Sequence, residues 1–216
     1  MMHLQQWGFR ALLVAAALGA WFWTQALIGK RAFPEGRIGD AVLEFTAPAN
    51  RFLLANPQWA DRLLILTSAL IDLLGIFIVG LAIFGPSLRP LLGLLILFSL
   101  RQLCQGLCAL PPPEGMIWRH PGFPSLLVTY GTSSDLFFSG HTAIAVYACI
   151  ELGNLGGPAA AVAGVIIALI EVSTVLILRA HYIMDVFTGA ITALWVWTVV
   201  SYLAPRLDPL VAALFR

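Results

Sequence analysis

Long apolar stretches alternate with shorter polar segments along this chain. A window of about 19 residues picks out six such stretches, near 9–29, 62–84, 90–110, 137–153, 158–179 and 182–204. Each has about 20 residues, the length that an α-helix needs to cross a hydrocarbon core of about 30 Å. The pattern predicts an all-α protein, a six-transmembrane helix bundle that forms a single integral membrane domain over residues 1–216.

The loops between these stretches are unequal. Six crossings place both termini on one side, so the long loops 30–61 and 111–136 fall on the other side with the short link 180–181. The first loop contains IGDAVLEF and NRFLLANPQWADR, broken up by prolines, which indicate short interfacial helices. These helices form either an ordinary cap or a substrate gate. We expect function on this elaborate face.

Composition agrees with lipid as the main solvent. Hydrophobic residues make up 60% of the chain and charged residues 11%, whereas a soluble domain has about a quarter charged residues. The net charge of +1 and the absence of a basic stripe give no indication of nucleic-acid binding. The first stretch is too long for a signal peptide, and no small-residue cleavage pattern follows it.

Two histidines stand at the starts of predicted spans on the elaborate face. An ionisable group at membrane depth costs about 2.5–3.5 kcal/mol on insertion scales, so each needs a reason. His181 opens the sequence HYIMD, and Asp185, four residues on, shares its helix face. A carboxylate there accepts a hydrogen bond from one ring nitrogen and leaves the other as a directed lone pair. The pattern favours a catalytic histidine over a packing one.

His141 stands in DLFFSGHT, directly after Ser139 and Gly140. The first N–H groups of a helix have no internal partners and bind anions. Gly140 lets that backbone approach a ligand closely, and Ser139 adds a hydroxyl donor. The stretch therefore predicts a phosphate-binding helix start with His141 beside it as a general acid or base.

Two further charged residues lie near this level. Arg179 precedes His181 by two positions and can neutralise a phosphate oxygen; its alternative is an ordinary interfacial arginine. Asp135 is placed to hydrogen-bond the His141 ring or to bind a headgroup amine, and its alternative is an N-terminal helix acid.

Three other residues are candidate supports. Arg101 and Glu171 lie deeper in their spans, where interhelical ion pairing is the favoured role. For Glu171 the second candidate role is a site acid that reaches towards His141. Trp118 lies in the second long loop, where an aromatic-belt role competes with a cation–π contact to a quaternary ammonium.

These motifs resemble those of the phosphatidic acid phosphatase-like superfamily of membrane phosphotransferases. DLFFSGHT is similar to the third motif of sphingomyelin synthases, HYIMD to the fourth, and the stretch from Arg101 into the Leu-Pro-x-Pro turn to the second. Plant phosphatidylcholine:diacylglycerol cholinephosphotransferases are equally similar, because they share FFSGH, that turn, and Arg-x-His-Tyr-x-x-Asp, matched here from Arg179 to Asp185. The resemblance spans roughly residues 60–204.

The departures from these patterns concern specificity. Ile183 replaces the usual Thr, and the Pro-Leu-Pro-Asp motif of sphingomyelin synthases is missing near the first loop. Lipid phosphate phosphatases carry two cations where this chain has Ala82 and Val175. A phosphomonoester dianion needs more positive charge than a phosphodiester monoanion. The substitutions therefore favour headgroup transfer over dephosphorylation.

Residues and resemblance together predict a headgroup phosphotransferase that needs no cofactor and no metal. It would move phosphocholine or phosphoethanolamine from a glycerophospholipid to diacylglycerol or ceramide. His181, held by Asp185, would form a phosphohistidine, and His141 would protonate the leaving oxygen. Ser139, Gly140 and Arg179 would hold the phosphate oxygens.

Three alternatives remain open at this point. A lipid phosphate phosphatase would release the phosphohistidine to water. Two histidines and a carboxylate could instead form a metal-binding facial triad. A non-catalytic lipid-binding or scrambling protein would keep the fold without the chemistry.

Two indications of orientation disagree. Lys and Arg near the span ends are more numerous on the elaborate face, which predicts a cytoplasmic location for it. The resemblance implies cytosolic termini and a site on the exoplasmic or periplasmic side. We adopt the second, because a phosphate site would itself enrich that face in arginine.

Overall fold

A computed structural model describes residues 2–30, 38–130 and 135–214, and within these ranges it contains helices and no strands. The all-α class is therefore confirmed. Within these described ranges, five helices are long and apolar enough to cross a membrane. They are α1 (Met2–Ile28), α4 (Pro57–Phe84), α5 (Arg89–Leu107), α6 (Gly140–Ile177) and α7 (Ile183–Ala213).

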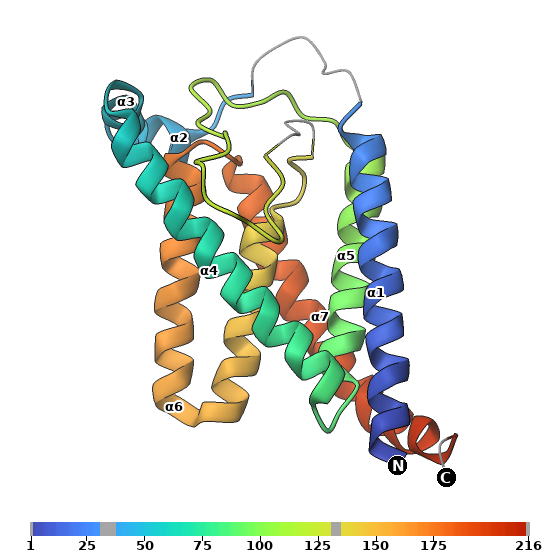
Figure 1. The fold of residues 1–216 in the computed structure, drawn as a ribbon. Coiled ribbons are helices and arrows are strands. Elements are labelled where there is room, and N and C mark those ends of the chain that lie inside the picture. Colours follow the sequence, from blue (N-terminus) through green and yellow to red (C-terminus); the bar gives the residue numbers. More distant parts are fainter. Residues whose placement is uncertain (1, 31–37, 131–134, 215–216) are drawn as a thin grey trace.

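Helix α6 folds back on itself. Gly157 has φ 70° and ψ −160°, which is outside the helical region, and Pro158 follows at the start of the second arm. Gly164 lies against Cys149 of the first arm, since a Cβ added at Gly164 would be 2.9 Å from the Cys149 Cβ. Figure 1 shows the two arms side by side with the turn at the bottom. The arms correspond to the predicted stretches 137–153 and 158–179.

Helix α7 continues beyond residue 204, where the sequence pattern ended it, through Pro205 and Pro209 to Ala213. A proline removes one hydrogen bond of the helical ladder, so packing has to stabilise this extension. Asp208 accepts a hydrogen bond from the Leu88 amide at 2.7 Å, which ties the extension to the turn between α4 and α5.

The two ends of the bundle differ, as the loop lengths predict. The start of α1 and the end of α7 lie at the bottom of Figure 1, whereas the long loops lie at the top. The first loop forms two short helices, α2 (Ala41–Phe45) and α3 (Ala47–Ala55). Residues 31–37 of that loop lie outside the described part of the chain. The interfacial position of α2 and α3 stays a prediction.

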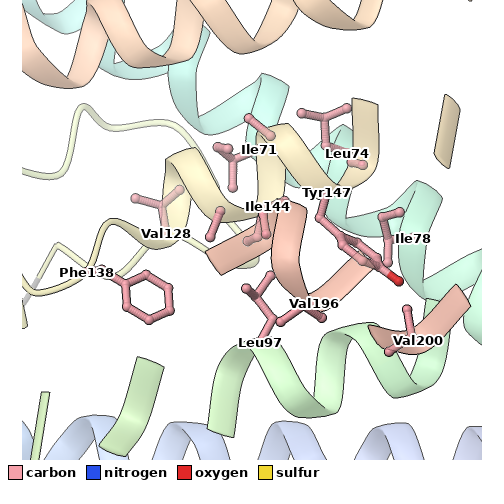
Figure 2. Close-up of a cluster of buried hydrophobic side chains, with 14 residues drawn as sticks. Ile71, Leu74, Ile78, Leu97, Val128, Phe138, Ile144, Tyr147, Val196 and Val200 are labelled. Atoms are coloured by element: carbon pink, nitrogen blue, oxygen red, sulfur yellow. The ribbon is translucent and has the colours of Figure 1, made fainter. Parts of the chain in front are cut away.

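The core lies between the long helices. Figure 2 shows its central cluster, to which α4, α5, both α6 and α7, and the loop before α6 contribute. Its labelled members are Ile71, Leu74, Ile78, Leu97, Val128, Phe138, Ile144, Tyr147, Val196 and Val200.

A partly buried ion pair joins two helices at the lower end of the bundle. The Arg89 guanidinium donates from Nε and Nη2 to the two carboxylate oxygens of Glu151, at 2.8 and 2.6 Å. Glu151 is 1% exposed, so the pair satisfies a carboxylate that would otherwise be buried without compensation. The Tyr147 hydroxyl donates to the Arg89 carbonyl at 3.0 Å. These contacts fix α5 against the first arm of α6.

Candidate active site

A cavity of about 420 Å³ lies between α1, α4, α5 and the starts of α6 and α7. Its polar lining comes mainly from Arg101, Gln102, Asp135, His141 and His181. The rest is lined mostly by apolar side chains of α1, α4 and α5. Both histidines predicted to be catalytic therefore line one space.

His181 lies immediately before the first turn of α7 and is 6% exposed. Its Nδ1 is 3.5 Å from Oδ2 of Asp185, the carboxylate predicted to orient it. That separation is longer than a normal hydrogen bond, and Nδ1 has no hydrogen-bond partner among the described residues. The pair is an electrostatic contact that can tighten when a ligand binds, since catalytic hydrogen bonds are often long in the absence of substrate.

Two carboxylates cap the start of α7. Asp185 Oδ2 accepts the Tyr182 amide at 2.9 Å, and Asp40 Oδ2 accepts the Ile183 amide at 2.6 Å. Asp40 also accepts the amides of Val42 and Leu43 from α2 through its other oxygen. Sequence reasoning did not single out Asp40, although an aspartate before a short helix is a typical N-cap signal. The first loop thus helps to fix the residue next to His181.

The start of α6 has the geometry of an anion site. Ser139 is its N-cap, and its Oγ accepts hydrogen bonds from the Thr142 amide at 3.3 Å and the Thr142 hydroxyl at 3.0 Å. Within the described residues, the amides of Gly140 and His141 have no acceptor, as expected for the first turn of a helix. The His141 Nε2 is buried and also lacks a partner among the described residues.

A backbone hydrogen bond joins the two helix starts. The Ser139 amide donates to the Asp185 carbonyl at 3.0 Å. Gly189 allows this approach, because an added Cβ there would lie 2.7 Å from the Ser139 carbonyl oxygen. The two helix starts, each with a histidine beside it, are held together as a result.

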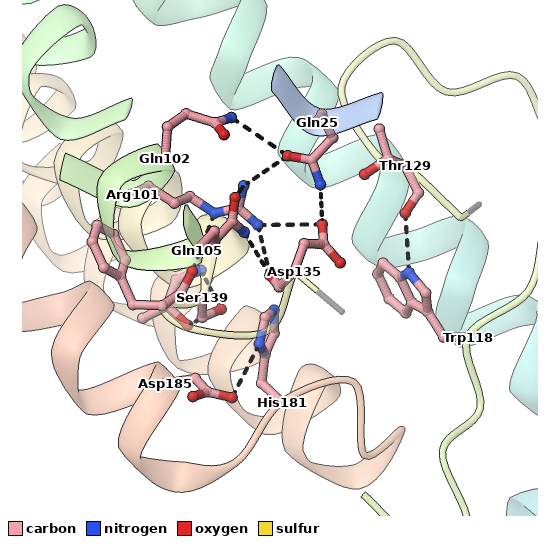
Figure 3. A network of polar contacts seen from close by, with 12 residues as sticks. Gln25, Arg101, Gln102, Gln105, Trp118, Thr129, Asp135, Ser139, His181 and Asp185 are labelled. Carbon is pink, nitrogen blue, oxygen red and sulfur yellow. Dashed lines mark hydrogen bonds and ion pairs between the residues drawn. The ribbon is translucent and has the colours of Figure 1, made fainter. Parts of the chain in front are cut away.

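Arg101 holds the segment that leads into α6 (Figure 3). Its Nε donates to the Phe138 carbonyl at 3.1 Å and its Nη2 to the Asp135 carbonyl at 3.2 Å. Nη2 is also 3.6 Å from the Asp135 carboxylate, and Nη1 donates to the Gln105 side chain at 3.2 Å. Arg101 is thus ion-paired with Asp135 on the loop before α6, whereas the prediction was a pair between two helices.

Three glutamines complete this polar cluster. Gln25 donates to the Asp135 carboxylate and accepts from Arg101 Nη1 at 3.5 Å and from Gln102 at 3.4 Å. Gln105 donates to the Asp135 carbonyl at 2.6 Å. None was among the predicted site residues. The available signal was three amide side chains inside apolar stretches, where polar groups seek partners.

A family model described as AtPDCT1/2, the phosphatidylcholine:diacylglycerol cholinephosphotransferase family, matches residues 39–202. The chain belongs to this family. Neither the comparison with curated proteins nor that with solved structures gave a match. Family membership bears out the cholinephosphotransferase part of the resemblance. The sphingomyelin synthase part stays a resemblance.

Membership in the cholinephosphotransferase family implies a phospholipid headgroup phosphotransferase. It supports transfer of phosphocholine from phosphatidylcholine to diacylglycerol in a membrane. The long apolar helices are compatible with a multi-pass membrane protein. The matched range contains the starts of α6 and α7 but leaves out α1.

Trp118 stands at the polar end of the cavity of this cholinephosphotransferase family member. Its ring meets the His141 ring edge to face, with centroids 5.3 Å apart, and lies 4.9 Å from the Tyr130 ring. Its Nε1 donates to the Thr129 carbonyl at 3.1 Å. Burial raises the pKa of the Tyr130 phenol, whose hydroxyl contacts Ser68. Trp118 is thus a fixed aromatic surface beside His141.

Arg179 lies at the C-terminal end of α6 in a Schellman motif. The Ala180 amide donates to the Val175 carbonyl at 2.9 Å and the Arg179 amide to the Leu176 carbonyl at 3.1 Å. Arg179 has φ 54° in the left-handed region, a conformation that costs a non-glycine residue about 1–2 kcal/mol.

The Arg179 side chain turns towards the loops. Its Nη1 donates to the Glu114 carbonyl and its Nη2 to the Leu43 carbonyl at 3.0 Å. Arg179 does not line the cavity in the described part of the chain. To serve as the predicted phosphate ligand it would have to exchange these carbonyls for phosphate oxygens, so its role as a ligand stays a prediction.

Glu171 also lies away from the cavity lining. Its Oε2 accepts a hydrogen bond from the Thr67 hydroxyl of α4 at 2.6 Å, and the side chain is fully buried. This contact joins the second arm of α6 to α4. Among the described residues, Glu171 forms neither the predicted ion pair nor a hydrogen bond with His141.

The predicted residues therefore fall into three groups. His141, His181, Gly140, Asp135, Arg101 and Trp118 line the cavity. Asp185 contacts His181, and Ser139 caps the helix that carries His141. Arg179 and Glu171 form hydrogen bonds that hold the surrounding helices and loops together. Among the described residues, no group of three or more His, Cys, Asp and Glu side chains is arranged to hold a metal ion.

Gly140→Ala tests how closely Arg101 packs on the start of α6. A Cβ at position 140 would lie 2.9 Å from Arg101 Nε, so the guanidinium and the segment it holds must shift. Displacement of a reactive group by about 1 Å can cost ~100-fold in rate, and we expect a loss of that order in phosphocholine transfer.

The matched control is Gly106→Ala. Gly106 lies on α5, the same helix as Arg101, and a Cβ there meets nothing within 4 Å. It should transfer phosphocholine like the wild type in the same assay. Full activity of Gly140→Ala would contradict the role given to this contact.

Proposed function

We propose that this chain transfers phosphocholine from phosphatidylcholine to diacylglycerol through a phosphohistidine on His181. The observation that carries the proposal is the placement of two imidazoles, from separate helix starts, on one cavity with a mostly apolar lining. A phospholipid has this division: a charged phosphodiester joined to apolar chains. The family match supports the same donor and acceptor.

The first step forms the phosphohistidine. Nδ1 of His181 faces Asp185, which leaves Nε2 as the nucleophile. Nε2 attacks phosphorus, the bond from phosphorus to the glycerol oxygen breaks, and His141 gives that oxygen a proton. Diacylglycerol is released, and phosphocholine remains on His181.

The second step reverses the first with a new acceptor. His141, now neutral, takes the proton from the hydroxyl of another diacylglycerol, whose oxygen attacks phosphorus while the bond to His181 breaks. A phosphodiester of the same type is broken and formed, so no outside energy source is needed. The apolar lining disfavours water at the phosphohistidine, which favours transfer over hydrolysis.

The start of α6 stabilises the negative charge of the phosphate group. The free amides of Gly140 and His141 and the positive end of the helix favour an anion there. Ser139 lies behind the lining, where its oxygen accepts from Thr142; to donate its hydroxyl proton to a phosphate oxygen it would have to turn towards the cavity. Arg101 lies directly behind Gly140 and adds a positive charge to the site.

Trp118 is the candidate for headgroup recognition. An ammonium within about 6 Å of an aromatic ring centroid is attracted to the ring face. The Trp118 ring centroid is 5.3 Å from that of His141, so a choline attached to a phosphate at His141 is within reach. This contact would favour a quaternary ammonium over the better hydrated primary ammonium of phosphatidylethanolamine.

We further propose six membrane crossings, with each arm of α6 crossing once. The first arm, residues 140–156, and the second, residues 158–177, measure about 25 and 30 Å at ~1.5 Å per residue. Both lengths are near the ~30 Å hydrocarbon thickness. In this arrangement both termini lie on the cytosolic side and the histidines on the exoplasmic or periplasmic side.

Purified protein incubated with phosphatidylcholine labelled in the choline headgroup tests the chemistry. The wild type should pass the label to added diacylglycerol, and His181→Ala should lose about 10³-fold or more, since the nucleophile is removed. His141→Ala should lose about 10²–10⁴-fold. His120→Ala, a change to an exposed loop histidine, is the control and should keep full transfer.

The same assay separates the alternative functions. Ceramide and phosphatidylethanolamine replace acceptor and donor in parallel reactions, and phosphate release from phosphatidic acid would identify a phosphatase. Wild-type transfer by His181→Ala would contradict the phosphohistidine.

Thiol labelling tests the topology. Asn154→Cys lies near the turn of α6 and Phe123→Cys lies in the second long loop, and both positions are exposed. A membrane-impermeant thiol reagent added to intact cells should label Phe123→Cys and spare Asn154→Cys. The wild type, which has Cys104, Cys108 and Cys149, gives the background. Equal labelling of both variants from one side would contradict the six-crossing arrangement.

A further inference from the structure

Helix α1 lies outside the range matched by the family, residues 39–202, yet it forms one wall of the cavity. Its contribution is a single helical face: Val14, Ala17, Leu18, Ala20, Trp21 and Thr24. These positions follow the three- and four-residue spacing of one helix face. The wall is therefore built by a segment that the family match does not cover.

The opposite face of α1 has a different environment. Ala16, Leu12 and Trp23 are exposed, which is the surface a bundle presents to lipid. Two residues that line the cavity, Ala20 of α1 and Ser99 of α5, are also exposed. An opening of the cavity between the two helices, at the depth of the bilayer, would account for this exposure.

The apolar part of the cavity runs along the helices. Its apolar lining runs from Val14 to Trp21 on α1 and from Leu91 to Phe98 on α5, about 10 Å at ~1.5 Å per residue. Tyr147 and Leu91 lie at its lower part, where the Tyr147 hydroxyl is held by the Arg89 carbonyl. An elongated, mostly apolar space that starts at a phosphate site fits a single acyl chain.

We propose that α1 forms a binding site for one acyl chain of the glycerolipid substrate and thereby sets the chain length that the enzyme prefers. The inference rests on the proposed function, because the chain must belong to a lipid whose phosphate or hydroxyl group reaches the histidines. Phosphatidylcholine and diacylglycerol carry the same diacylglycerol chains, so either lipid can supply the occupant.

The same helix links the acyl site to the chemistry. Gln25, one residue beyond the last lining position, donates to the Asp135 carboxylate and accepts from Arg101. A chain that fills the cavity presses on α1 directly below this amide. Occupancy of the apolar space and the position of the Arg101–Asp135 cluster are therefore coupled through one helix.

Physical selection at this site depends on shape. Lipid tails are as apolar as the side chains of the wall, so moving a chain from bilayer to cavity gains little by the hydrophobic effect. The preference for one chain length then depends on whether the chain fits without overpacking, which protein interiors tolerate poorly. A larger side chain on the cavity face should exclude long chains while leaving room for short ones.

The test compares one substitution at adjacent positions of α1. Ala17→Phe points the new ring into the cavity, and Ala16→Phe places the same ring on the exposed face. Transfer is measured with purified protein and phosphatidylcholine carrying oleoyl or octanoyl chains, with the diacylglycerol held constant. A second set varies the diacylglycerol chains and holds the donor constant.

We expect Ala17→Phe to lower the ratio of long-chain to short-chain transfer by about tenfold or more, as overpacking of a fitted site would. The set that shows the change identifies which lipid fills the cavity. Ala17→Leu, a smaller change that guards against misfolding, should lie between wild type and Ala17→Phe. Ala16→Phe should keep the wild-type ratio.

Other outcomes contradict the inference. An unchanged ratio in both Ala17 variants would show that no acyl chain occupies the cavity, even though the wild type transfers phosphocholine. An equal shift in Ala16→Phe would show that the wall is not selective. No transfer by the wild type with either chain length would instead overturn the proposed function, and the acyl-chain site with it.

Discussion

The hydrogen bond from the Ser139 amide to the Asp185 carbonyl, 3.0 Å long, joins the starts of α6 and α7, and the rest of the site depends on it. His141 lies at the start of α6 and His181 just before the start of α7. Because the two starts are joined, both imidazoles line one cavity. The surrounding contacts serve this junction: Arg101 holds the segment before α6, and Asp40 caps α7. The site is therefore a property of two helix ends.

Much of the fold could be predicted because the solvent of a membrane protein imposes long apolar helices. The turn at Gly157 falls between the predicted stretches 137–153 and 158–179, and the elaborate face follows from the loop lengths. The end of α7 could not be predicted, because Pro205 and Pro209 normally stop a helix, and its continuation depends on tertiary contacts such as the hydrogen bond that Asp208 accepts from the Leu88 amide. Local signals cannot report such distant contacts.

The candidate site, like the fold, could be predicted from the sequence only in part. His141, His181 and Gly140 were predicted from spacing and depth, and they line the cavity. The two arginines differ from their predicted roles. Arg179, predicted to bind phosphate, instead donates to a backbone carbonyl of the first loop. Arg101, predicted as a structural ion pair, reaches the start of α6. Gln25 could not have been found from its neighbours, since its partners lie on α5 and on the loop before α6. Which polar group meets which is decided by packing.

The central claim is that one phosphorus atom is attacked first by His181 and then by an acceptor oxygen. Two in-line displacements retain the configuration at phosphorus, whereas one direct displacement inverts it. The most direct measurement is therefore the stereochemical course of transfer from phosphatidylcholine that is chiral at phosphorus to diacylglycerol. Retention is the predicted result; inversion would contradict the phosphohistidine and leave the two histidines only as acid and base.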